Sequence, residues 1–185
     1  SPKGQKMTKI YTRQGDDGYT FVKTKNGLEK FHKNNDLVHV LGEIDELSCH
    51  LGLILSELGY NYGSPADKIF DIQKYLYILS ASMFSIDKEE LNNKILEMEK
   101  DIDNYNNNFL PVLDDLTYPG GCRVSAMTHV ARAVTRRIER RVSSINNREL
   151  IRYFNRLSDY LFVLARYDSM TQQETLWKPM GKNEK

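Results

Sequence analysis

The chain has 185 residues, and 26 lysines and arginines against 25 aspartates and glutamates give it a formal net charge of +1. This length predicts one domain with a sizeable core, and the near-neutral charge argues against a broad nucleic-acid surface. The two cysteines, Cys49 and Cys122, make neither a disulfide framework nor a metal-binding pattern, so we expect a reducing compartment. No apolar run reaches the length of a membrane span, and we expect no membrane association.

The first 35 residues are predicted to be irregular, with two short strand-like pieces at 10–12 and 19–22. The Asp17-Gly18 pair between these pieces is typical of a hairpin turn. The polar residues that follow the second piece are predicted to form a loop.

The same turn has a second interpretation, as a phosphate-binding segment. Gly15 and Gly18 would let backbone amides approach a phosphate closely, and Thr12, Thr20 and the nearby aspartates would add hydroxyl and Mg²⁺ contacts. A Walker A loop is excluded, because the chain contains no G-x-x-x-x-G-K-[ST]. Both interpretations stay open at this point.

Apolar residues at steps of three and four predict five helices joined by turns. Asp36 is expected to cap the first helix, Gly59 to end it, and Ser64-Pro65 to begin the second. The pattern indicates a single domain (1–185) of all-α class, an up-down five-helix bundle over 36–169 with an irregular N-terminal segment, followed by a tail over 170–185 that contains Trp177. The predicted helices cover about 36–58, 64–84, 87–104, most of 119–141, and 149–169.

The fourth predicted helix carries an unusual concentration of positive charge. Three arginines spaced by four residues, Arg132, Arg136 and Arg140, gather on the side opposite its apolar stripe. Like charges at this spacing repel one another, and planar guanidinium groups bind phosphate oxygens two at a time. The face therefore favours an anionic ligand, and a solvated cationic face is the alternative.

Three blocks together resemble the ATP:cob(I)alamin adenosyltransferases of the diol-utilisation (PduO) type, the kind also responsible for mitochondrial vitamin B12 processing. The first is IYTRQGDDG at 10–18, similar to a YT-x-x-GD-x-G segment, and the second is GEIDELSCHLG at 42–52, similar to a G-x-x-DEL helix. The third is the pair HVARAVTRRIERR at 129–141 and NRLSDYLFVLAR at 155–166. Their order and separations make the match specific, over roughly half the chain.

The resemblance implies a homotrimer with ATP and cobalamin bound between subunits. In that family Co(I) attacks C5′ of ATP and triphosphate leaves, so no general base is needed and His129 is expected to be structural. The cofactor is Mg²⁺ carried by ATP, with no metal site made by protein side chains. The resemblance also implies an electron-donating flavoprotein and a B12-dependent mutase as partners, no nucleic acid, and a location in the cytoplasm or the mitochondrial matrix.

The family's functional residues carry over position by position. Arg132 would pair with Asp45 of a neighbouring subunit, and these two with Arg136 are the predicted catalytic residues. Cobalamin would be lined by Leu116 of the loop before the fourth predicted helix and by Asn155 and Phe162 of the fifth. ATP would be bound by one subunit's Thr12, Arg13, Gln14, Gly15, Asp16, Gly18, Thr20 and Lys33, and by the adjacent subunit's Arg136, Arg137, Ile138, Glu139, Arg140 and Asn155.

Two residues depart from the family pattern. Ile138 stands where alanine is usual, and Leu116 stands where the family usually has a phenylalanine that covers the lower face of the cobalt. One alternative is therefore a non-catalytic cobalamin or nucleotide carrier of the same fold. Another is a helical interaction protein that uses the arginine face on an acidic partner.

Overall fold

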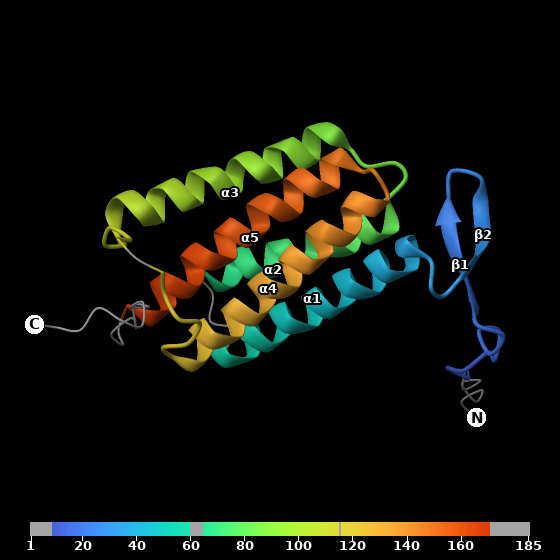
Figure 1. Ribbon diagram of the computed structural model, residues 1–185, viewed down its shortest axis with the longest axis horizontal. Coiled ribbons are helices and arrows are strands. Elements are labelled where there is room, and N and C mark those ends of the chain that lie inside the picture. The colour runs from blue at the N-terminus through green and yellow to red at the C-terminus, as the bar shows by residue number, and fades with distance from the viewer. Residues whose placement is uncertain (1–8, 60–64, 115, 171–185) are drawn as a thin grey trace, which may run out of the picture.

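The computed structural model describes residues 9–59, 65–114 and 116–170. Five helices in these residues lie side by side as an elongated bundle, and a small β-hairpin lies beyond one end of it (Figure 1). The predicted all-α five-helix class is confirmed, whereas Trp177 of the predicted tail lies outside the described residues. The helices are α1 (Asp36–Leu58), α2 (Ala66–Ala81), α3 (Lys88–Asn108), α4 (Arg123–Ser144) and α5 (Arg148–Ser169).

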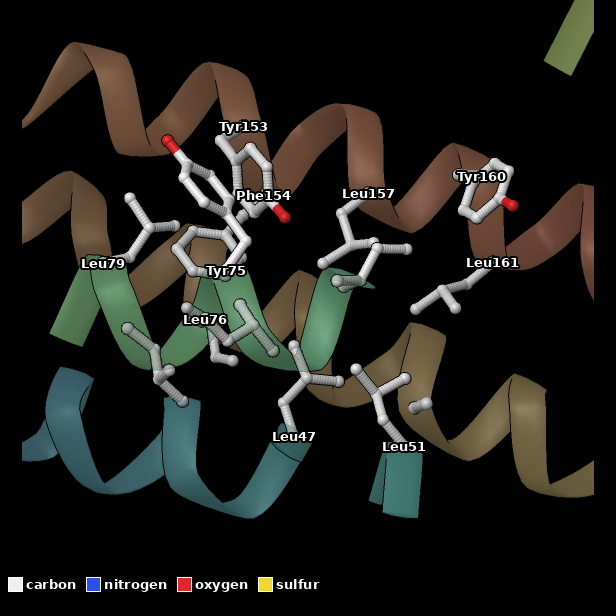
Figure 2. Close-up of a cluster of buried hydrophobic side chains, with 14 of the residues drawn as sticks. Leu47, Leu51, Tyr75, Leu76, Leu79, Tyr153, Phe154, Leu157, Tyr160 and Leu161 are labelled. Atoms are coloured by element: carbon white, nitrogen blue, oxygen red, sulfur yellow. The ribbon is translucent and has the colours of Figure 1, made fainter. Parts of the chain in front are cut away.

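The core runs along the axis of the bundle. α4 packs against α5 and α1, α5 also packs against α3, and α1 packs against α2. Figure 2 shows one section of this core, in which Leu47 of α1 and Leu76 of α2 face Phe154 and Leu157 of α5. All four side chains are fully buried, as the three-and-four spacing of their helices predicts. None of the helices in the described residues is both long and apolar enough to cross a membrane.

The N-terminal segment is more ordered than predicted. β1 (Tyr19–Thr24) pairs antiparallel with β2 (Gly27–His32), with Thr24 opposite Gly27. The residues predicted as a loop therefore form β2, and the hairpin turn lies at 25–26 instead of at Asp17-Gly18. Positive φ falls on Gly27 (101°) and on neither turn residue, an arrangement typical of a tight turn followed by a glycine bulge.

Helix boundaries differ from the predicted ones by a few residues. Asn35 caps α1 in place of Asp36, because its side chain accepts a hydrogen bond of 2.9 Å from the amide of Leu37. Gly59 ends α1 in the left-handed conformation, as expected. α3 continues to Asn108, beyond the predicted end at 104.

Candidate active site

A cavity of about 360 Å³ lies between the loop that precedes α4 and the middle of α4 and α5. The structure brings Leu116, Phe162 and Arg132 together in its wall, although they are predicted separately as cobalamin and catalytic residues. Leu116 is 65% exposed there. The remaining wall residues are Leu113, Thr117, Tyr118, Pro119 and His129.

His129 is the cavity residue that sequence reasoning set aside as structural. Its imidazole is 5% exposed, and its Nδ1 accepts a hydrogen bond from Nε of Arg132 at 3.2 Å. Burial, with the neighbouring positive charge of Arg132, lowers the pKa of His129 to about 4. Burial and the charge of Arg136 likewise lower the pKa of Arg132, although its guanidinium remains charged. The signal in the sequence was the spacing of three between His129 and Arg132, which places both on one face of a helix.

The four arginines beyond Arg132 divide into two pairs. Arg136 and Arg140 are exposed, and within the described residues neither side chain forms an ion pair. Arg137 hydrogen-bonds to Glu46 of α1 and lies 3.7 Å from Oε1 of Glu43. Their neighbour Arg141 lies 3.6 Å from the same Glu43 oxygen and 3.4 Å from Asp36. The structure therefore uses one pair to hold α4 against α1 and leaves the other pair facing outward.

Ile138, predicted among the ATP contacts, is fully buried in the core. Its side chain contributes to packing between α4 and its neighbours, so the prediction is corrected for the side chain. The departure from alanine at this position is thus a change in the core.

Glu139 and Asn155, both predicted ATP contacts, form a hydrogen bond with each other. Nδ2 of Asn155 donates to Oε1 of Glu139 at 3.1 Å, which links the predicted faces of α4 and α5. Asn155 itself is exposed.

The N-terminal half of the predicted site is held by the hairpin. Nζ of Lys33 donates to the carbonyl oxygen of Gly15 at 2.8 Å, which closes the loop back on the end of β2. Gly18 has a φ of 84°, and Arg13 has a φ of 61°. A residue other than glycine is uncommon in this left-handed region, and such residues often lie at functional sites. Asp17, by contrast, forms an ion pair with Lys30, whose Nζ lies 2.8 Å from Oδ2 of Asp17. This hydrogen-bonded contact lowers the pKa of the Asp17 carboxyl.

Within the loop, the other predicted ATP residues are accessible. The hydroxyl of Thr12 accepts a hydrogen bond of 3.4 Å from the amide of Gln14, and both residues are exposed. Asp16 is also exposed, and Thr20, in β1, is half-buried.

One chain does not bring the two halves of the predicted site together. In the described residues, the hydrogen bonds and ion pairs of residues 9–18 all lie within the loop and the hairpin. This segment projects clear of the bundle, past the start of α1 (Figure 1). Asp45 is exposed on α1, and the nearest polar partner of Arg132 in the described chain is His129 rather than Asp45.

The described residues contain no group of three or more His, Cys, Asp and Glu side chains able to hold a metal ion. Within one chain the cavity wall offers the guanidinium of Arg132 beside apolar side chains, whereas the ammonium of Lys33 lies apart from it, on the loop at Gly15. Such donors suit a polyanion with an apolar neighbour.

Comparison with known proteins shows the family of the chain. The chain is 34% identical to the corrinoid adenosyltransferase MMAB of Bos taurus over 93% of its own length and 76% of the relative. It is 35% identical to the corrinoid adenosyltransferase of Bacillus subtilis, over 85% of each protein. A variant PduO-type ATP:corrinoid adenosyltransferase from Lactobacillus reuteri, solved with cobalamin and ATP, superposes with a TM-score of 0.78 at 28% identity, covering 92% of this chain and all of that one. The model of the cobalamin adenosyltransferase family matches residues 10–168, and the chain belongs to that family.

Proposed function

We propose that the protein transfers the 5′-deoxyadenosyl group of ATP to the cobalt of cob(I)alamin, giving adenosylcobalamin and triphosphate. The observation that carries this proposal is the cavity in which Leu116 and Phe162 form an apolar wall beside the guanidinium of Arg132. An apolar wall suits the face of a corrin ring, and the outward arginines of the next turns suit the triphosphate.

The reaction needs no proton acceptor on the protein. Co(I) supplies the electron pair of the new Co–C5′ bond, and the C5′–O bond breaks with its electrons on the departing triphosphate. Negative charge therefore increases on the triphosphate in the transition state, where Arg136 and Arg140 act as preplaced donors. Removal of one such donor typically costs about 3–4 kcal/mol in the barrier.

We place Mg²⁺ on the triphosphate oxygens, because the described side chains offer no carboxylate cluster for it. Thr12 and Thr20 would supply hydroxyls to the Mg²⁺-bound triphosphate, and Lys33, beside the Gly15 loop, would supply positive charge to the triphosphate itself. When bound, the ion neutralises charge on the leaving group.

We further propose that the active site forms between subunits of a homotrimer. The loop at 9–18 has its polar contacts in its own hairpin, so the arginines that it would face belong to a second copy. The same assembly would bring Asp45 of one copy to Arg132 of the next. An electron-donating flavoprotein that supplies Co(I), a B12-dependent mutase that uses the product, and a location in the cytoplasm or mitochondrial matrix complete the proposal.

Turnover tests the activity directly. The protein is mixed with ATP, Mg²⁺ and chemically reduced cobalamin, and the corrinoid spectrum is followed for the Co–C bond while triphosphate is measured. We expect equal amounts of the two products. Arg136→Ala should be inactive, whereas Arg123→Ala is a matched control, because Arg123 lies on the same helix but pairs with Glu57 at 3.5 Å. Cobalamin binding without conversion would instead indicate a carrier, and neither binding nor conversion would favour an interaction protein.

Subunit mixing tests the assembly. Lys33→Ala impairs the loop half of a site and Arg136→Ala the arginine half, so a refolded equal mixture should regain about a quarter of the parent activity, since one site in four has both halves intact. Arg136→Ala mixed with Arg140→Ala is the control, because every site then lacks an arginine. Recovery in the control mixture, or none in the test mixture, would contradict a shared site.

A further inference from the structure

His129 and Arg132 form a contact that the reaction itself does not require. They lie three residues apart on α4, so their side chains project from the same face one turn apart. The bond from Nε of Arg132 to Nδ1 of His129 is 3.2 Å long. The ring of Phe162 packs edge-on against the imidazole, with centroids 6.2 Å apart, and fixes the ring from the α5 side.

The direction of this bond is fixed by protonation. Arginine does not lose its proton in proteins, so Nε of Arg132 is always a donor. Nδ1 of His129 must then carry a lone pair, which places the imidazole proton on Nε2. Burial and the adjacent guanidinium lower the pKa of His129 to about 4, so the ring is a neutral acceptor at neutral pH.

The bond to His129 leaves the two terminal nitrogens of the Arg132 guanidinium available for another partner. A guanidinium has five N–H groups in a flat fork, and His129 takes only the one on Nε. No other hydrogen bond of the Arg132 side chain is found in the part of the chain described, and the residue lines the cavity with Leu116 and Phe162. Arg136, one turn further on, repels the guanidinium of Arg132.

We propose that His129 is a positioning residue, which holds Arg132 by Nε so that its two terminal nitrogens point as one fork at the carboxylate of Asp45 in the neighbouring subunit. This inference rests on the proposed shared active site for its consequence in catalysis. The contact itself lies within one chain. His129 thus acts through Arg132 and touches no reacting atom.

Two variants of His129 separate the loss of its hydrogen-bond acceptor from the loss of its packing against Phe162. His129→Asn keeps an oxygen acceptor near the position of Nδ1, whereas His129→Phe keeps a ring against Phe162 but has no acceptor. The matched control is Thr135→Val on the same helix, a fully buried residue whose hydroxyl donates only to the carbonyl oxygen of Ala131, at 2.7 Å. It removes a buried polar group from α4 without touching Arg132.

Kinetics with cob(I)alamin give the first test. His129→Phe should lower kcat/KM by about 10–100-fold, a typical effect of displacing a site residue, while His129→Asn and Thr135→Val stay within about threefold of the parent. In an Arg132→Lys background, which lacks Nε–H, His129→Phe should cause no further loss. Equal impairment of the Asn and Phe variants, or effects that multiply in the double variant, would overturn the proposal.

A spectroscopic test does not depend on turnover. In a ¹H–¹⁵N spectrum of arginine side chains, the Nε–H signal of Arg132, assigned by its absence in Arg132→Lys, should be protected from exchange with water. The protected signal should survive in His129→Asn and disappear in His129→Phe. An unprotected signal in the parent protein refutes the positioning role even if the enzyme is active. A protected signal in an inactive parent would refute the proposed function instead.

Discussion

Removal of Arg136 and removal of its neighbour Arg137 on α4 should affect different properties of the protein, turnover in the first case and stability in the second. Arg136 is exposed and forms no ion pair within the described residues, whereas Arg137 is held by Glu46 and Glu43 of α1. We therefore predict that Arg136→Ala abolishes turnover at unchanged stability. Arg137→Ala should instead weaken the contact between α1 and α4.

The magnitudes follow from the exposure of each pair. The Arg137–Glu46 pair is open to solvent, with both side chains more than 40% exposed, while the Glu43 side chain is only 14% exposed. An exposed pair contributes about 0.2–1 kcal/mol, so the two pairs together contribute about 1 kcal/mol. With a urea dependence of about 2 kcal/mol per molar, Arg137→Ala should lower the unfolding midpoint by about 0.5 M. Arg136→Ala should change the free energy of unfolding by less than about 0.5 kcal/mol but lower the rate by about 10²–10³-fold.

Urea titrations followed by circular dichroism, at one fixed protein concentration, measure the first quantity, and initial rates measure the second. Arg136→Lys sharpens the test, because a point charge does not reproduce a two-pronged contact and should restore little activity. Full activity of the lysine variant would refute the assignment of Arg136 to the triphosphate. An Arg137→Ala protein with an unchanged urea midpoint would refute the prediction that Arg137 stabilises the contact between α1 and α4.

Three further predictions follow from particular side chains. Asp45→Asn and Arg132→Gln should show a coupling of about 1–3 kcal/mol in kcat/KM if the two residues meet between subunits, and additive effects would mean that they do not. Leu116→Phe should raise the four-coordinate fraction of Co(II) seen by electron paramagnetic resonance with ATP bound, because a phenyl ring excludes water from the lower face better than a leucine that is 65% exposed; an unchanged spectrum with cobalamin demonstrably bound would contradict this. Burial raises the pKa of Asp168 from its ordinary 3.8 to about 6, so its ionisation costs stability as the pH rises through that interval. Asp168→Asn should therefore raise the free energy of unfolding by about 1–2 kcal/mol at pH 7.5 and hardly at all at pH 4, and equal effects at both pH values would refute this sign.

The helices could be predicted because their burial repeats with the period of the backbone. The stripe of α1 that contains Leu47 and Leu51 is fully buried, and Gly59 ends the helix as expected. The hairpin was misplaced because two glycine-containing signals compete in one short segment. The carboxylate of Asp17 forms an ion pair with Lys30 and accepts a hydrogen bond from the amide of Tyr19. The hairpin turn instead lies at 25–26, where the following Gly27 has the positive φ.

Sequence motifs could predict which residues group in the site, but not the surroundings of each side chain. Sequence blocks grouped Arg136, Arg137 and Ile138 as one unit, but a helix turns by about 100° per residue and sends the three side chains to different environments. One is exposed, one is paired with α1, and one is fully buried. The contact of His129 with Arg132 was missed because a histidine on a helix has no fixed meaning until its burial and its partner are known.

The paired carboxylates on α1 explain how α4 tolerates so many arginines. Stacked guanidinium groups repel by a few tenths of a kcal/mol per pair in an isolated helix. Glu43 offsets part of this repulsion, because its Oε1 forms ion pairs with both Arg137 at 3.7 Å and Arg141 at 3.6 Å. The contact between α1 and α4 thereby sets the carboxylates of Asp36, Glu43 and Glu46 against the guanidinium groups of Arg137 and Arg141, whereas Arg136 and Arg140 are exposed and form no ion pair within the described residues. A polyanion that binds there gains two forks without breaking the contacts that hold α4 in place. On the proposed function, anion binding and stability then depend on different arginines of the same helix.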